Sequence, residues 1–249
     1  MKIKNATNHG FSNCAVCSLR NDMVFAEISR YSVIGFHTQV TDYSLPRGMV
    51  LQAVGTPVTA LYCIRKGVVK LIKYEDNGDQ HIVRLLKKGD IATIEWVFAD
   101  KSDHSAVAIG EVHACRIPIK FFHDFILRHA DIQNSLLHKF RDALHEAELW
   151  LSQLAGGTIP VRVRIARILL RLCEGDNGDI LHLPNDDLAS ILGVTEETVS
   201  RVISKFRQLG ILMRDSGSPI GRYTRADVPA LKIIAANVLP DSNEEVKVF

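Results

Sequence analysis

Cysteines are the residues in this sequence best suited to bind a metal. Cys14 and Cys17 are separated by two residues, and Cys115 follows far along the chain. Thiolate sulfur is a soft donor, and a close pair with a distant third is a donor set that suits iron–sulfur clusters. Five cysteines, an odd number, in a chain of 249 residues do not fit a disulfide framework. We therefore expect a reduced, cytoplasmic protein in which Cys14, Cys17 and Cys115 are candidate metal ligands.

A second set of residues has the spacing of a unit that reads DNA. Ala189 is followed four residues later by Gly193. Two helices that cross steeply need a small residue where they approach, and the tight turn between them needs glycine where φ is positive. Thr195 is a good N-cap for the second helix. The spacing predicts a helix-turn-helix within residues 185–204, with a common core of Leu188, Leu192, Val194, Val199 and Val202.

The second helix of this unit carries the side chains that we expect to contact DNA. Arginine can pair with guanine through two hydrogen bonds, glutamate can accept one from cytosine N4, and serine or threonine can meet the thymine methyl group. The candidate DNA-binding residues are Glu197, Thr198, Ser200, Arg201 and Lys205.

Local charge supports double-stranded DNA as the partner, although the whole chain is nearly neutral. The net charge of +2 argues for no partner by itself. Between Thr195 and Arg225, however, the sequence has six basic and three acidic residues. Residues 212–223 predict a two-stranded wing, with Arg214, Arg222 and Arg225 as candidate phosphate contacts.

Two further regions must position these residues. Residues 43–118 alternate short apolar runs with turn signals such as Asn77-Gly78, which predicts an antiparallel β-roll. Residues 121–156 predict one long helix whose apolar positions step by three and four residues. So narrow a seam favours a parallel homodimer over packing on the helix's own domain, which is the alternative. The seam consists of Gln133, Leu137, Phe140, Leu144, Ala147, Leu151 and Leu154, extended backwards by Ile126 and Ala130.

The expected fold class is α+β: an N-terminal antiparallel β-roll of the cyclic-nucleotide-binding kind, a long dimerisation helix and a C-terminal winged helix-turn-helix. The expected divisions are a cysteine-bearing segment at 1–26, the roll at 27–120, the dimerisation helix at 121–156, the DNA-binding domain at 157–240 and a tail at 241–249.

This layout resembles the Crp/Fnr superfamily of transcription regulators. The run Glu197-Thr198-Val199-Ser200-Arg201 looks like the signature of that family. Serine in its fourth place is closer to the fumarate–nitrate reductase regulator branch, whose half-site begins TTGAT, than to the cyclic-AMP receptor branch. The resemblance implies a homodimer that binds palindromic DNA, RNA polymerase as a partner, and a signal sensed by the N-terminal domain.

The fumarate–nitrate branch senses a redox or gas signal through four thiolates on a [4Fe–4S] cluster. Cys14, Cys17 and Cys115 stand at matching places, but no further cysteine follows Cys17 in the N-terminal segment. Three explanations stay open: Asp22 supplies the fourth ligand, Cys63 reaches the site from the roll, or the cluster is lost and the thiols are switches or remnants. Cys63 and Cys173 are otherwise interpreted as buried apolar residues.

Other effectors fit the sequence less well. Cyclic-nucleotide binders carry Gly-Glu and Arg-Ser where this chain has Thr93-Ile94 and His104-Ser105. Without the arginine, a bound phosphate loses its main charge-assisted hydrogen bonds, so cyclic AMP is not expected. The alternative to a cluster is a Crp-like regulator that responds to a small organic ligand or to a haem-bound gas in the roll. Candidate haem ligands, none of them singled out, are His37, His81, His104, His113 and His123.

Enzyme and membrane motifs are not found in the sequence. It contains no phosphate-binding loop, nucleophile elbow, HExxH run or dinucleotide fingerprint. No apolar run approaches the roughly 18 residues that span a bilayer. We therefore expect neither an enzyme nor a membrane protein.

Overall fold

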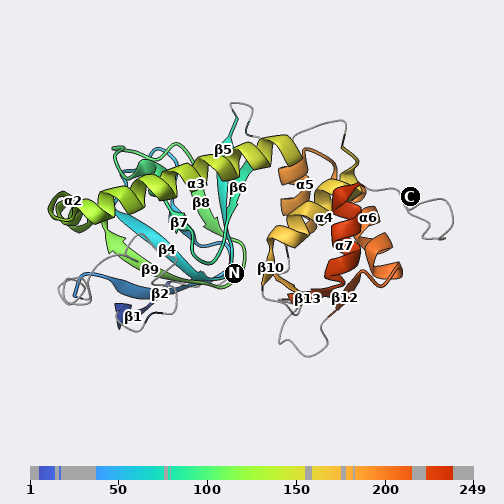
Figure 1. The fold of residues 1–249 in the computed structure, drawn as a ribbon, viewed down its shortest axis with the longest axis horizontal. Coiled ribbons are helices and arrows are strands. Elements are labelled where there is room, and N and C mark those ends of the chain that lie inside the picture. The colour runs from blue at the N-terminus through green and yellow to red at the C-terminus, as the bar shows by residue number, and fades with distance from the viewer. Residues whose placement is uncertain are drawn as a thin grey trace. The chain divides into compact units, whose positions relative to one another are not determined.

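The computed structural model describes residues 6–14, 17, 38–75, 78, 80–154, 159–174, 178–181, 183–214 and 223–237. The chain forms two compact units, residues 1–148 and 149–249, which are considered separately here. The first unit is a roll of antiparallel strands with helices, and the second is a winged helix-turn-helix (Figure 1). The expected α+β class is therefore confirmed. Asp22, His37 and the expected tail at 241–249 lie outside the described residues.

Two antiparallel sheets make up the N-terminal unit. The first sheet has the order β1-β2-β9-β4-β7, and the second has the order β3-β8-β5-β6. The strands of the first sheet are β1 (Thr7–Phe11), β2 (Thr41–Leu45), β9 (Val112–Pro118), β4 (Ala60–Lys66) and β7 (Ile91–Ala92). Those of the second are β3 (Val50–Gln52), β8 (Ser105–Ala108), β5 (Val69–Tyr74) and β6 (Gln80–Leu86). A short 3-10 helix, η3 (Ile94–Trp96), follows β7.

The first sheet contributes to two separate apolar cores because successive side chains of a strand point to opposite faces. Ile64 of β4 and Ala114 of β9 pack with residues of the second sheet, so this core lies between the two sheets. Cys63 and Cys115, one position away in each strand, belong to the other core, together with the helices that follow β9. The cysteines of the roll therefore face the helices.

The stretch expected to be one helix over 121–156 is two helices. Helix α2 (Ile119–Arg128) and helix α3 (Ala130–Leu154) are separated at His129, whose φ of −133° and ψ of 94° are extended. Ile126 was expected in the dimer seam, but it is buried within its own unit beside Phe122 and Phe125. The seam therefore cannot run back through α2, because its apolar face packs on the roll.

Helix α3 has two apolar faces rather than one. Ile132 and Leu136 are buried in the core that contains Cys63 and Cys115. This face of α3 therefore packs on its own domain, which was the alternative to a dimer seam. The other face exposes Leu137, Leu144 and Leu151, whose exposed fractions are 66%, 63% and 66%. These three leucines are seven residues apart, the heptad spacing of the expected seam.

Among its described residues, the C-terminal unit contains the end of α3, four complete helices and a small sheet. The helices are α4 (Val161–Arg171), α5 (Asn185–Leu192), α6 (Glu196–Gln208) and α7 (Val228–Ala236). The sheet has the order β10-β11-β13-β12. Its strands are β10 (Cys173–Glu174), β11 (Asp179–Leu181), β13 (Tyr223–Ala226) and β12 (Leu212–Arg214). The pairing of β12 with β13 confirms the expected wing, while residues 215–222 between them lie outside the described part.

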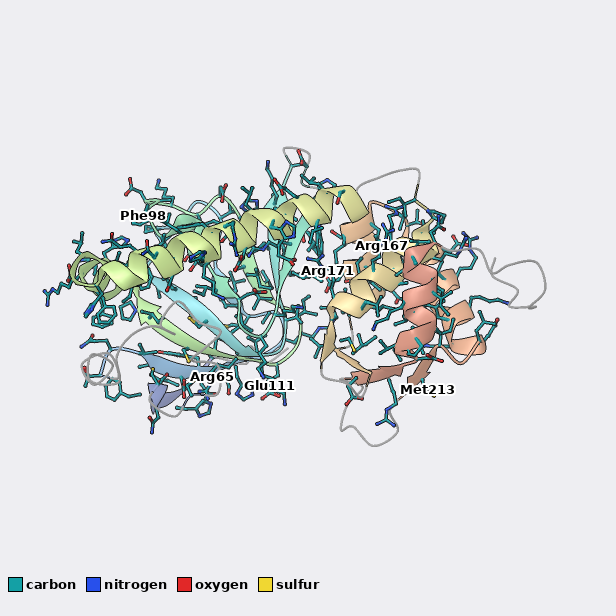
Figure 2. All side chains as sticks on the ribbon, viewed as in Figure 1. Arg65, Phe98, Glu111, Arg167, Arg171 and Met213 are labelled. Atoms are coloured by element: carbon teal, nitrogen blue, oxygen red, sulfur yellow. The ribbon has the colours of Figure 1, made fainter. Side chains whose placement is uncertain are left out.

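Two of the arginines of α4 hold this unit together. Arg167 and Arg171 project from α4 (Figure 2). Arg167 donates from Nε to the carbonyl oxygen of Ala235 in α7 at 3.0 Å. The guanidinium of Arg171 lies over the Trp150 ring, 5.9 Å from its centroid, in a cation–π contact.

Candidate DNA-binding surface and cysteine cluster

The turn between α5 and α6 has the geometry that the sequence predicts. Gly193 ends α5 with a φ of 61°, in the left-handed region that favours glycine. Its N–H and that of Val194 both donate to the carbonyl oxygen of Ala189, the residue four positions before Gly193. Thr195 then caps α6, with its Oγ1 accepting a hydrogen bond from the Thr198 N–H at 3.3 Å. The helix-turn-helix is therefore confirmed in its local geometry.

Helix α6 has one buried face and one exposed face. Val199, Ile203 and Phe206 are buried and fix the helix to its unit. Among the five candidate DNA-binding residues, Glu197, Ser200 and Arg201 are exposed, and Thr198 and Lys205 are half-buried. Val202, expected in the core, is only half-buried. Ile203 and Phe206 were missed, although they lie four and seven residues after Val199, a spacing that places them on the same helical face.

The wing arginines differ in their surroundings. Arg225 of β13 is exposed, and its Nε lies 3.7 Å from Oδ1 of Asp179 in an ion pair. Arg222 lies outside the described residues. Met213 of β12 is 47% exposed and lies at the wing, as labelled in Figure 2. Arg225 is therefore already paired within the wing, while Arg201 on α6 is exposed.

Arg164 is a residue whose role the sequence analysis missed. It is one of four arginines in α4, but it is only 7% exposed. Its Nη1 donates to the carbonyl oxygen of Leu192, the last residue of α5, at 2.9 Å. Burial lowers the pKa of this guanidinium. A buried cation at this helix C-terminus satisfies a terminal carbonyl and complements the helix dipole, directly before the turn that orients α6.

We expect Arg164→Met to destabilise the protein by about 1–3 kcal/mol, because the Leu192 carbonyl loses its charged donor. Urea unfolding of the full chain measures this change in free energy. Arg162→Met is the matched control, because Arg162 lies on the same helix and is only half-buried. Equal stability of the two variants would show that the Arg164 hydrogen bond does not hold the turn.

The cysteine cluster begins as a row of residues across three strands of the first sheet. Asp42 of β2 is paired in register with Cys115 of β9, and Cys115 is paired with Cys63 of β4. Residues directly opposite on neighbouring strands point to the same face. Cys14 and Cys17 pack against the same core as Cys63 and Cys115. Cys14, Cys17 and Cys115, the three candidate metal ligands, therefore border one apolar core, to which Cys63 also belongs.

Asp42 links the N-terminal segment to the roll. Its Oδ1 accepts hydrogen bonds from Ser12 Oγ at 2.5 Å and from Cys115 Sγ at 3.3 Å. Its Oδ2 accepts from Arg65 Nη1 at 2.8 Å. Burial raises the pKa of Asp42, but these three hydrogen bonds and the charge of Arg65 outweigh it, so the pKa is lowered. Asp42 therefore stays ionised and holds Ser12, two residues before Cys14, against Cys115.

Burial keeps three of these thiols, those of Cys14, Cys63 and Cys115, protonated at neutral pH by raising their pKa. Burial is the main cause that raises the pKa of Cys14 to about 11 and that of Cys115 to about 12. Burial also raises the pKa of Cys63, which negative charge on Cys115 or Cys14 would raise further. Within the described part of the chain, no three His, Cys, Asp or Glu side chains are arranged to hold a single metal ion. A four-iron cluster has a different requirement, because each thiolate binds a different iron.

The effector positions of the roll are engaged in internal contacts. Thr93 has a φ of 75°, is fully buried, and donates from Oγ1 to the Ala60 carbonyl oxygen at 3.1 Å. Ser105 Oγ accepts from the Val54 N–H at 3.0 Å. His104 Nδ1 lies 2.7 Å from Asp103 Oδ1. None of these three side chains is an arginine, whose guanidinium can form two hydrogen bonds with a bound phosphate.

Two other candidate haem histidines also contact protein groups. His113 Nδ1 lies 3.3 Å from Ser44 Oγ. The Nε2 of His123 is hydrogen-bonded to the carbonyl oxygen of Val97, and its ring stacks on Phe98 at a centroid distance of 5.9 Å. Axial ligation of haem through either of these nitrogens would require the contact to break.

Comparisons with known proteins agree with both units. Residues 163–232 match the Crp-like helix-turn-helix domain, and residues 43–129 match the cyclic nucleotide-binding domain. A cyclic AMP receptor protein of Thermus thermophilus is 27% identical over 176 residues, covering 70% of this chain and 80% of that protein. An anaerobic regulatory protein of Aggregatibacter actinomycetemcomitans is 21% identical over 175 residues, covering 68% of this chain and 67% of that protein.

A solved structure supports the same fold. FixK2 from Bradyrhizobium japonicum superposes with a TM-score of 0.68 at 22% identity, covering 80% of this chain and 99% of that one. At this identity the likeness shows the shared fold alone.

These findings define a DNA-binding regulator with an N-terminal domain of the cyclic-nucleotide-binding kind, as the sequence predicts. The chain belongs to the Crp/Fnr family of transcription regulators. Its relatives are regulators rather than enzymes. They include both anaerobic regulators and cyclic-AMP receptors, so they do not separate the two branches of the family. Among the described helices, none has the length and hydrophobicity that crossing a membrane requires.

Proposed function

We propose that this chain regulates transcription as a homodimer that binds palindromic DNA, under the control of a redox or gas signal at the cysteine cluster. The observation that carries the proposal is the exposed face of α6. Glu197, Ser200 and Arg201 face solvent there, while Val199 and Ile203 fix the helix to its unit. Such a helix can enter a major groove with its N-terminal residues at the base edges. The fumarate–nitrate-like signature supports half-sites that resemble TTGAT.

The exposed stripe of α3 supports the homodimer. Leu137, Leu144 and Leu151 are each more than half exposed in the single chain. Burying a leucine side chain is worth about 1.5–3 kcal/mol, so water disfavours this stripe in a monomer. A second α3, packed in parallel, covers the stripe and places two copies of α6 on one face of a duplex. Two half-sites one turn (~34 Å) apart then specify a palindrome.

The inner face of α3 provides a path from the cysteine cluster to the dimer interface. Leu136 and Phe140 pack with the core that contains Cys63 and Cys115. Leu137, the next residue after Leu136, lies on the exposed stripe. A change in packing around the cysteines therefore acts on the helix that also forms the dimer. Such a signal shifts the population between two pairings of the helices, of which one fits DNA.

A [4Fe–4S] cluster is the cofactor that these donors fit, with Cys14, Cys17 and Cys115 as ligands. The donor set is soft sulfur inside an apolar core, beside the cation Arg65. Thiols with a pKa near 11 or 12 are protonated at neutral pH and are poor nucleophiles, which disfavours direct oxidation as the signal. When bound, a cluster supplies a redox-active centre whose potential depends on charge and hydrogen bonds to its sulfurs. The Ser12 hydroxyl would be a hydrogen-bond donor there, Arg65 would add positive charge, and the Asp42 carboxylate would add negative charge.

The names of the relatives support a redox or gas signal only in part. Two of the similar proteins are an anaerobic regulatory protein and a cyclic AMP receptor protein. The choice between them rests on residues of this chain: three cysteines in one core favour the former, and Thr93 and His104 at the effector positions disfavour the latter. Contact with RNA polymerase follows from the role in transcription.

Selection from random-sequence DNA, followed by an electrophoretic mobility shift, tests the proposed function. We expect one enriched sequence with two inverted half-sites, bound under anaerobic conditions and released after exposure to oxygen or nitric oxide. A shuffled duplex of the same composition is the control. If no sequence is enriched, the chain is not a sequence-specific regulator. If binding is specific but insensitive to both gases, the redox or gas part of the proposal is wrong.

A further inference from the structure

Four of the five cysteines border the same apolar core. Cys14, Cys17, Cys63 and Cys115 all belong to, or pack against, one apolar core of the N-terminal unit. The fifth, Cys173, lies on β10 in the other unit. The four therefore come together from distant parts of the sequence, which the spacing of cysteines along the chain does not show.

The positions of Cys63 and Cys115 follow from the register of the sheet. They are directly opposite on the antiparallel strands β4 and β9, which lie about 4.8 Å apart as in other sheets. Both side chains point to the face that packs on α2 and α3. Cys14 and Cys17 of the N-terminal segment pack against this same core.

Two cations, Arg65 and Lys139, lie near the cysteines. Arg65 pairs with Asp42, which accepts a hydrogen bond from Cys115, and Lys139 lies on α3, the helix that packs on this core. These two cations offset part of the negative charge that a cluster with four thiolates brings into the core. Binding releases the thiol protons to solvent.

Asp42 is less suited than Cys63 to be the fourth ligand. Its carboxylate already accepts hydrogen bonds from Ser12, Cys115 and Arg65. To bind iron it would have to give up some of these donors. Cys63 is 1% exposed, and in the described structure its surroundings are mainly apolar.

We propose that Cys63 is the fourth sulfur ligand of a [4Fe–4S] cluster, beside Cys14, Cys17 and Cys115. This inference rests on the proposed function, which assigns the cluster to the other three cysteines. Cys63 on β4 would then take the place of the further N-terminal cysteine that this sequence lacks. Because Lys139 and Phe140 lie on α3, the dimer helix would pack directly beside this ligand.

Anaerobic reconstitution with iron and sulfide tests the inference on the full-length chain. We expect the four irons and four sulfides of one cluster per chain in the natural protein and in Cys173→Ala, the matched control. We expect Cys63→Ala to lose most of this iron and sulfide and its broad visible absorbance. Cys63→Ser should retain a less stable cluster, because an alkoxide is a harder donor than a thiolate. Circular dichroism melting checks that each variant is folded.

Two results would overturn the inference and can be told apart from failure of the proposed function. A full cluster with unchanged absorbance in Cys63→Ala shows that Cys63 is not a ligand, while the cluster itself stands. Iron-edge X-ray absorption of the natural protein needs no variant: we expect only sulfur around iron, and an oxygen ligand would assign the fourth site to an aspartate such as Asp22 or Asp42. A natural protein without iron and sulfide instead removes the cluster from the proposed function.

Discussion

Leu144→Glu is expected to convert the protein to a monomer and to weaken its binding to a palindromic site by about 100-fold or more. Leu144 is 63% exposed at the centre of the stripe formed with Leu137 and Leu151. In a parallel dimer the two substituted glutamates would face each other, replacing an apolar contact with two like charges. A monomer binds only one half-site, so it loses the gain in affinity that comes from linking two DNA contacts in one molecule. Sedimentation equilibrium measures the oligomeric state, and fluorescence anisotropy measures DNA affinity.

His145→Glu is the matched control for this prediction. His145 is exposed and follows Leu144 directly, but it lies off the stripe. The same charge placed there should leave the dimer and its DNA affinity unchanged. A Leu144→Glu protein that stays dimeric would show that α3 is not the dimer interface, and both variants becoming monomers would show that charge anywhere near this region is sufficient.

Arg201→Ala is expected to weaken binding to the selected site by about 1–3 kcal/mol and to relax the preference at one guanine in each half-site. Arg201 is exposed on the first two turns of α6, on the face opposite the buried Val199 and Ile203. An arginine there can form two hydrogen bonds with guanine O6 and N7. Affinities for a panel of duplexes with single base changes measure this effect.

Arg207→Ala provides the comparison on the same helix. Arg207 is exposed in the last turn of α6, away from the N-terminal end that enters the groove. We expect at most a loss that is uniform over all sequences, as for a phosphate contact. If Arg201→Ala also weakens binding to every duplex equally, Arg201 contacts phosphate and does not read a base.

Much of the DNA-binding unit could be predicted from sequence because its signals are local. Gly193 and Thr195 determine a turn and a cap within a few residues of themselves, and both have the expected geometry. The wing was predictable for the same reason. The core of α6 was predicted less well, since Ile203 and Phe206 were overlooked in favour of Val202. Continuing the helical period from Val199 would have found them.

The features that could not be predicted from sequence depend on contacts between distant parts of the chain. The break at His129 comes from the packing of Phe122, Phe125 and Ile126 on the roll, which the heptad pattern of α3 does not reveal. Arg164 looks like a surface cation in sequence, and only the position of α5 shows that it is buried beside the Leu192 carbonyl.

The cysteine cluster is the clearest case of this dependence. The pairing of Cys63 with Cys115 is set by the register of β4 and β9. One residue of slip would turn Cys63 to the opposite face of the sheet, away from the helices. Sequence alone therefore left its role open.

The central claim is that two copies of the chain read two half-sites at a fixed separation, and altering that separation tests it most directly. Anisotropy titrations would compare the selected duplex with one in which about five base pairs, roughly half a helical turn, are inserted between the half-sites. We predict that the insertion reduces affinity to the level of shuffled DNA, because the second α6 then faces the wrong side of the duplex. Unchanged affinity would contradict the account and show that one copy of α6 accounts for recognition by itself.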